Sequence, residues 1–182
     1  RARTGKVRDL NPTTEVAFAG HPTIGTASAV RDQGHRGDMV LELGVGPIPC
    51  SFDGDTASFV TSAPLARLSN PDVALVAAAL GLPETAVVTA THSPVQASLG
   101  LPFVIVELNA ITSLTDCAPD ITAIRKGAQE HPAGLDFAIY AYVRSGDQID
   151  ARMFAPLDEI PEDPATGSAS GALAALLLVL LG

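Results

Sequence analysis

An internal repeat is the feature that most restricts the fold of this chain. Residues 8–16 match residues 152–160 in spacing, and residues 22–28 match residues 164–170 after a loop that is two residues shorter in the second copy. The matched pairs are Arg8 and Arg152, Pro12 and Pro156, Glu15 and Glu159, Val16 and Ile160, Pro22 and Pro164, Gly25 and Gly167, Thr26 and Ser168, Ala27 and Ala169, and Ser28 and Ser170. Chance similarity between segments rich in Ala, Gly and Pro is the alternative. The repeat predicts two pseudo-symmetric domains, each with one strand, loop and helix unit.

The rest of the chain mixes strand and helix patterns without regular alternation, which favours an α+β fold over a doubly wound sheet. A buried strand is expected at 101–108, where the sequence is continuously apolar. The domain boundary is expected at residue 92, which gives domains 1–92 and 93–182. Further helices are expected over 22–33, 70–83, 118–131 and from about Pro164 to the end, and further strands over 135–144 and 148–156.

The repeat also predicts that both domains are truncated. About 20 residues precede the first repeated helix and about 70 precede the second, if the second unit opens near Ser93. Each domain is therefore expected to lack about 50 residues, the first at its start and the second at its end. A protein with two unequal domains is the competing interpretation.

Composition and charge exclude several classes of partner. The net charge is −9, and no cluster of Lys or Arg is present, which argues against binding to nucleic acid or to an anionic membrane. The apolar run at residues 172–181 is too short to span a bilayer, so a fully buried helix is expected there. Cys50 and Cys117 have no metal-binding spacing, and the charged first residues do not resemble a signal peptide. A cytoplasmic protein is expected.

The two repeated helix starts are candidate anion sites. Each carries a proline, where a missing N–H removes no helical bond, and a glycine three residues later, Gly25 or Gly167. The free N–H groups and the positive end of the helix dipole suit a carboxylate or a developing oxyanion. His21 and Asp163 flank the two prolines at equivalent positions, where a general acid and a general base are required.

Each of these residues has a structural alternative. Asp163 could be only a helix N-cap, and His21 could be an ordinary loop residue. Thr26 and Ser168 could simply pack or hydrogen-bond within their helices, and the glycines could reflect close packing. The matched placement of His21 and Asp163 in the repeat favours the catalytic interpretation.

Several segments resemble the PhzF family of phenazine biosynthesis-like isomerases. They are "EVAFAGHPTIGTA" (15–27), "RMFAP" followed by "EDPATGSASGALAALL", and "ASLGLPFVIVEL" (97–108). The resemblance implies the diaminopimelate-epimerase-like fold, in which each of two domains wraps a strongly curved, barrel-like sheet around a central helix. On this basis the central helices begin near His21 and Pro164, and the active site lies in the cleft between the domains.

The resemblance also implies roles for individual residues. Gly20 and His21 would act from the first domain and Asp163 from the second, while Gly167 and Ser168 would bind the substrate carboxylate. Relatives shift a proton on a small, amino-acid-like acid without a metal or an organic cofactor, and a homodimer is possible by the same analogy. The family's main proton carrier is a glutamate in a Ser-Glu-Thr segment, and residues 1–20 contain no such segment.

Three functions are therefore weighed. The leading one is a cofactor-independent isomerase that uses acid/base proton transfer on a small carboxylated substrate. The second is a catalytically silent binding or scaffold protein that lacks the glutamate. The third is a racemase with one cysteine at each helix start, which is disfavoured because those positions are Ala19 and Pro164.

Overall fold

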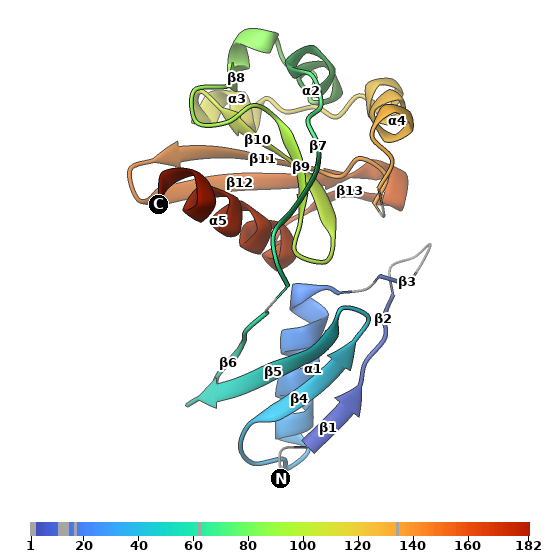
Figure 1. Cartoon of the computed structure of the whole chain (residues 1–182), viewed down its shortest axis with the longest axis vertical. Coiled ribbons are helices and arrows are strands. Elements are labelled where there is room, and N and C mark those ends of the chain that lie inside the picture. Colours follow the sequence, from blue (N-terminus) through green and yellow to red (C-terminus); the bar gives the residue numbers. More distant parts are fainter. Residues whose placement is uncertain (1–2, 11–14, 17, 62, 134) are drawn as a thin grey trace.

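The structure is a computed structural model, which describes residues 3–10, 15–16, 18–61, 63–133 and 135–182. It contains two separate multi-stranded sheets with five α-helices around them, so the predicted α+β class is confirmed (Figure 1). Among the described residues, no helix is both long and apolar enough to cross a membrane.

The first sheet has four strands and one accompanying helix, α1 (Gly20–Asp32). The strand order is β1-β4-β5-β6, with β1 parallel to β4 and the other neighbours antiparallel. Buried side chains from β4, β5 and α1 form a small core under the sheet. The strands are β1 (Arg3–Lys6), β4 (Met39–Leu43), β5 (Gly46–Asp53) and β6 (Thr56–Phe59).

The second sheet has the order β13-β12-β11-β10-β9-β7, and β8 also pairs with β10. Its strands are β7 (Ala66–Ser69), β8 (Val87–Val88), β9 (Val95–Ser98), β10 (Pro102–Leu108), β11 (Ile139–Ser145), β12 (Gln148–Ala155) and β13 (Ile160–Asp163). The helices beside it are α2 (Val73–Ala79), α3 (Ile111–Thr115), α4 (Ile121–Glu130) and α5 (Gly167–Leu181).

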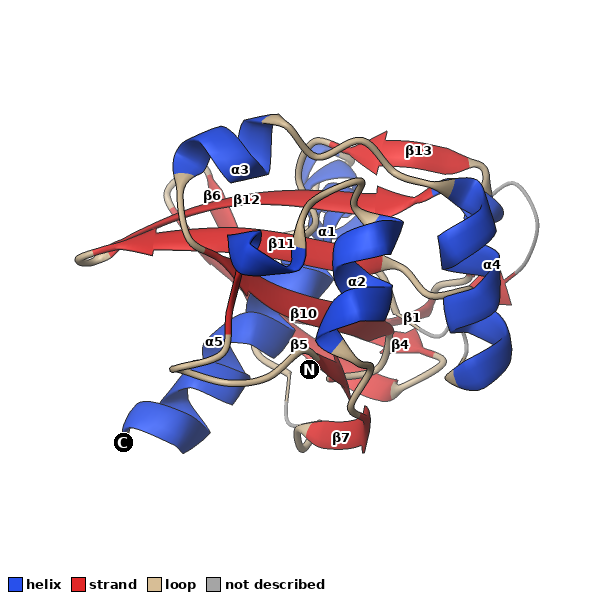
Figure 2. Ribbon diagram, turned by 90° about the horizontal axis from the view of Figure 1, so that it is seen from above, coloured by secondary structure: helices blue, strands red, loops and turns tan. Residues whose placement is uncertain are grey.

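Helices cover both faces of this sheet. Alternate side chains of β10 point to opposite faces, so Val104 and Val106 pack with α2 and α4 while Phe103 and Ile105 pack with α5. Figure 2 shows α2, α3 and α4 spread across one face, and Figure 1 shows α5 on the other. The continuous apolar sequence predicted as a buried strand is therefore explained, because both of its faces are covered.

Local signals set the ends of two helices that are shorter than the predicted ranges 70–83 and 118–131. The Asp120 carboxylate accepts a hydrogen bond from the Ala123 N–H at 2.8 Å and caps the start of α4. After α2, Gly81 adopts a φ of 67°, which a residue with a side chain rarely tolerates. A Cβ there would also lie 2.6 Å from the Ala118 carbonyl oxygen, so glycine is required at this helix end.

The last helix differs from the prediction in two ways. It begins at Gly167 rather than near Pro164, because Asp163 still pairs with Met153 as the last residue of β13. It is also not enclosed on all sides: Leu173 and Leu176 are buried, whereas Leu178 is 71% exposed. The expected full burial of this helix was therefore wrong, because the sheet covers only one of its faces.

Each copy of the repeat forms an antiparallel strand pair followed by a helix. The first copy comprises β2 (Asp9–Leu10), β3 (Glu15–Val16) and α1, and the second comprises β12, β13 and α5. The division between the two larger sheets falls between residues 59 and 66, because β6 belongs to the first sheet and β7 and β8 belong to the second. The expected domain boundary at residue 92 does not coincide with that division and stays a prediction.

Candidate active site

The amino-terminal ends of α1 and α5 meet between the two sheets. A Cβ on Gly20 would lie 3.5 Å from both the Gly167 Cα and the Ser168 backbone nitrogen, so little more than the space of one methyl group separates the two helix starts. Figure 1 shows both helices running away from this point. The predicted meeting of two repeated helix starts is therefore present in the structure.

A cavity of ≈ 170 Å³ lies at this junction. Its walls are largely apolar, and they come from both halves of the chain. The lining residues are Asp9, Leu10, Ala19, Gly20, His21, Pro22, Leu101, Phe103, Leu135, Met153, Ala155, Asp158, Ile160, Asp163, Thr166, Gly167 and Ser168. Such a cavity, concave and apolar with a few polar groups, is typical of a small-molecule site.

All five predicted site residues line this cavity. Gly20 and His21 come from the start of α1, Asp163 comes from the end of β13, and Gly167 and Ser168 come from the start of α5. The roles assigned to them stay predictions. The cavity nevertheless brings together residues that are more than 140 positions apart in the sequence.

The equivalence between the two glycines of the repeat does not hold in space. Gly25 is exposed, a Cβ added to it would meet no neighbouring atom within 4 Å, and it does not line the cavity. The residue that faces Gly167 is Gly20, because α1 begins there. Thr26, the repeat partner of Ser168, likewise lies outside the cavity lining.

Neither helix start is capped by a side chain within the described part of the chain. The N-cap residues are Ala19 and Thr166, and neither first turn contains an acidic residue. The first-turn backbone N–H groups are therefore not used by side-chain caps, although the carboxyl groups of Asp9 and Asp163 lie beside the two helix starts. Two such ends beside one cavity favour the binding of an anion, even though the whole chain is acidic.

Asp163 is not the N-cap of α5. Thr166 holds the N-cap position and donates a hydrogen bond from its Oγ1 to the Asp163 Oδ2 at 2.6 Å. The carboxylate is thus held in place, partly buried, at the mouth of the helix start. His21, in contrast, is exposed at the second position of α1.

Two further acidic residues in the cavity lining were not predicted. Asp9 and Asp158 are 3% and 6% exposed, and burial raises the pKa of each carboxyl above its ordinary value. A backbone N–H donates to each, from Ala19 at 2.9 Å and from Asp136 at 3.3 Å, and this partly offsets the effect of burial. Asp9 could have been noticed from the sequence, because the equivalent residue in the second copy of the repeat is the apolar Met153.

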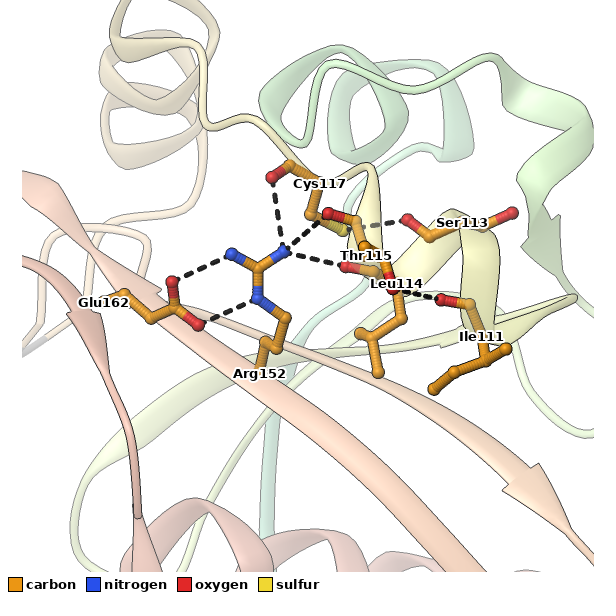
Figure 3. A network of polar contacts seen from close by, with 7 residues as sticks. All are labelled: Ile111, Ser113, Leu114, Thr115, Cys117, Arg152 and Glu162. Carbon is orange, nitrogen blue, oxygen red and sulfur yellow. Dashed lines mark hydrogen bonds and ion pairs between the residues drawn. The ribbon is translucent and has the colours of Figure 1, made fainter.

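Arg152 fixes the strand that carries Asp163. Its guanidinium donates two hydrogen bonds of 2.8 Å to the carboxylate of Glu162, the residue before Asp163, and reaches the end of α3 with its remaining nitrogen (Figure 3). The accepting carbonyls are those of Leu114, Thr115 and Cys117, at 2.9, 3.1 and 3.4 Å. The network therefore ties β12, β13 and α3 together beside the cavity.

The matched arginines of the repeat pair with glutamates at different positions of the two copies. Arg8 forms an ion pair with Glu15, at 2.7 Å. Arg152 instead pairs with Glu162, because Glu159 lies in a left-handed turn with a φ of 61°. Glu159 does not line the cavity.

The two cysteines take no part in the cavity. Cys50 and Cys117 are buried, and neither lines the cavity. Burial raises the pKa of both thiols, that of Cys117 to about 11. A thiol with a raised pKa is a poor proton acceptor near neutral pH. The positions where a two-cysteine racemase requires thiols are Ala19 and Pro164.

Comparison with known proteins agrees with the geometry of the fold. The solved structure of a PhzF family phenazine biosynthesis protein from Bacillus anthracis superposes with a TM-score of 0.75 at 22% identity, over 94% of this chain and 60% of that one. A predicted epimerase from Pseudomonas aeruginosa gives 0.77 at 23% identity, over 97% and 62%. At these identities the likeness concerns the fold.

Curated relatives are named as isomerases. An uncharacterized isomerase of Deinococcus radiodurans is 35% identical over 95% of this chain and 58% of its own length. The trans-2,3-dihydro-3-hydroxyanthranilate isomerase of Pseudomonas aeruginosa is 31% identical over 93% and 58%. The chain thus spans about three fifths of the length of these relatives. The family model of the phenazine biosynthesis-like proteins matches residues 1–180, which confirms the resemblance noted in the sequence: the chain belongs to the PhzC-PhzF family.

Proposed function

We propose that this chain forms the cleft of an isomerase that moves a proton on a small carboxylated, amino-acid-like substrate. The observation that carries the proposal is the close approach of the starts of α1 and α5, with His21 and Asp163 lining the cavity beside it. The two helix starts would hold the carboxylate and stabilise the enolate-like charge that forms when a neighbouring carbon loses its proton. His21 and Asp163 would carry that proton between the two carbons.

The substrate class follows from the walls of the cavity and from the relatives. Its apolar lining suits a ring or a short hydrocarbon body, and the uncapped helix starts suit one carboxylate. The relative from Pseudomonas aeruginosa is named for a dihydro-hydroxyanthranilate, a ring with a carboxylate, an amino group and a hydroxyl. This compound is the first substrate to test, and the reaction as proposed requires no organic cofactor or metal.

The proposal includes the finer features of the family fold. In the whole protein, each sheet would curve around its helix, α1 in the first half and α5 in the second, and the two halves would be related by pseudo-symmetry. The antiparallel strand pair and helix in each copy of the repeat support this arrangement.

A binding protein without catalysis is the second candidate. No glutamate is among the described residues that line the cavity, and residues 1–182 contain no Ser-Glu-Thr segment, which the family resemblance implies as the proton carrier. If no other group replaces that glutamate, the cleft would bind the carboxylate of the ligand without moving any carbon-bound proton of that ligand.

Solvent deuterium exchange distinguishes the two candidates. The protein, as its gene encodes it, is incubated in D2O with trans-2,3-dihydro-3-hydroxyanthranilate, and incorporation of deuterium into the ring is followed by NMR. We expect exchange in the wild type and a decrease of about 100-fold or more in Asp163→Asn and His21→Ala, because positioned acid/base groups contribute roughly 10²–10⁴-fold.

The control is Asp147→Asn, which removes an exposed carboxylate in the turn between β11 and β12. It is expected to exchange at the wild-type rate. Binding of the compound without any exchange would support the silent protein, and unchanged exchange in both site variants would refute the proposed roles.

A further inference from the structure

Asp9 has a feature that the proton transfer proposed above does not use. Its Oδ1 is the one buried side-chain oxygen or nitrogen in the described residues that has no hydrogen-bond partner. The residue is 3% exposed and lines the cavity at the helix junction. Buried polar atoms are almost always paired, so an unpaired one in a cavity wall indicates a missing partner.

The other oxygen of the same carboxyl group is occupied. The Ala19 N–H donates to the Asp9 Oδ2 at 2.9 Å, and Ala19 is the N-cap residue of α1. This bond fixes the carboxyl group beside the helix start that carries Gly20 and His21. The Oδ2 of Asp9 therefore anchors the helix start, and its Oδ1 has no hydrogen-bond partner.

The fold does not require a carboxyl group at this position. In the second copy of the repeat the equivalent residue is Met153, which is 5% exposed and lines the same cavity. An apolar side chain thus fills the matching place on the opposite wall. This difference between the two copies indicates that Asp9 is needed for binding a ligand rather than for folding.

The chemistry of the other lining residues narrows the kind of ligand. Among the described lining residues there are three aspartates, one histidine and no Lys or Arg. The helix starts supply N–H donors for a carboxylate, whereas the apolar walls next to Asp9 leave its Oδ1 without a donor. A ligand that pairs with both the helix-start N–H groups and the Asp9 Oδ1 carries a carboxylate at one end and an N–H or O–H donor near it.

We propose that Asp9 is a specificity-determining residue, whose Oδ1 accepts a hydrogen bond from an amino group adjacent to the carboxylate of the ligand. The inference rests on the proposed function, because it assumes that the carboxylate binds at the two helix starts. It adds to that proposal the group by which the cleft selects amino-substituted acids over plain ones.

Two stable compounds test this selection. Anthranilate and benzoate differ by the amino group next to the carboxylate, and their dissociation constants for the whole protein are measured by calorimetry. We expect the wild type to bind anthranilate about tenfold or more tightly than benzoate, because hydrogen bonds to charged or buried acceptors contribute on that scale.

Asp9→Asn is the decisive variant. The single carbonyl oxygen of asparagine can keep the bond from the Ala19 N–H, but its NH₂ group cannot accept a hydrogen bond from the ligand. The preference for anthranilate should therefore fall to about twofold or less, while benzoate binding and the melting temperature stay close to those of the wild type. Asp9→Leu should also lose the preference, with an additional loss of stability.

The matched control is Asp120→Asn, because Asp120 also accepts from a backbone N–H at a helix start but lies outside the cavity lining. It should keep the full preference. Failure of the wild type to bind either compound would refute the proposed function, and this inference with it. Binding of both compounds with an unchanged preference in Asp9→Asn would overturn the inference alone and leave Asp9 as an anchor for Ala19.

Discussion

At the scale of single residues, buried acids make the stability of this protein dependent on pH. Burial raises the pKa of Asp158, so the folded protein holds this proton more tightly than the unfolded chain does. The stabilisation from this group is complete below the ordinary pKa of an aspartate and is lost as the pH rises through the raised value. An asparagine at this position resembles the neutral acid, and its contribution to stability does not change with pH.

We therefore expect Asp158→Asn to gain stability relative to the wild type as the pH rises above about 3.9, the ordinary pKa of aspartate. Denaturant unfolding at several pH values measures the difference in unfolding free energy. Asp147→Asn, at an exposed turn, provides the comparison and should show a difference that does not change with pH. A constant difference for Asp158→Asn would contradict the assigned effect of burial.

Residues such as these mark the limit of prediction from sequence. His21 and Asp163 could be predicted because the repeat places them at matched helix starts. The burial of Asp158 could not be predicted, because it depends on contacts with residues far away in the sequence, such as Asp136.

At the scale of elements, the two ion pairs of the repeat provide a matched comparison. Arg152 joins Glu162 to three carbonyls at the end of α3, and its side chain is 27% exposed. Lysine keeps the charge but lacks the planar fork, so Arg152→Lys should lower the unfolding free energy by about 1–3 kcal/mol. Because Asp163 follows Glu162 in β13, catalytic exchange should decrease as well.

Arg8→Lys is the control for this prediction. Arg8 pairs with Glu15 at the surface, where both side chains are largely exposed and water competes for the same contacts. Its replacement should leave the denaturation curve within experimental error of the wild type. Equal losses of unfolding free energy in Arg152→Lys and Arg8→Lys would show that the planar guanidinium of Arg152 makes no specific contribution to stability.

Local sequence signals explain those elements whose ends are set by neighbouring residues. The Asp120 cap and the Gly81 turn are examples, and the strand at 101–108 followed from its apolar sequence. The start of α5 was misplaced by three residues because Pro164 fits the first turn of a helix equally well. Pairing of Asp163 with Met153, a tertiary contact, keeps that segment extended.

At the scale of the whole molecule, the exposed end of α5 should promote self-association. Leu178 and Val179 are 71% and 68% exposed on an otherwise apolar helix. Sedimentation velocity of the 182-residue chain should show association that grows with concentration, and Leu178→Gln with Val179→Gln should reduce it. The double variant should change the unfolding free energy by no more than about 0.5 kcal/mol per site, as is usual at exposed positions.

The opposite face of the same helix serves as the comparison. Leu176 is fully buried against the second sheet, so Leu176→Ala should cost about 2–5 kcal/mol of unfolding free energy. If the chain were monomeric at every concentration, or if the double variant were as destabilising as Leu176→Ala, the orientation of α5 described above would be wrong.

The central claim is that the starts of α1 and α5 together bind one carboxylate. Titration of the ¹⁵N-labelled protein with anthranilate, followed through backbone amide resonances, tests it most directly. The account predicts saturable shifts of the Gly20, Gly167 and Ser168 amides, and none of comparable size with anthranilamide, which has no carboxylate. Shifts confined to other residues, or equal shifts with both compounds, would contradict it.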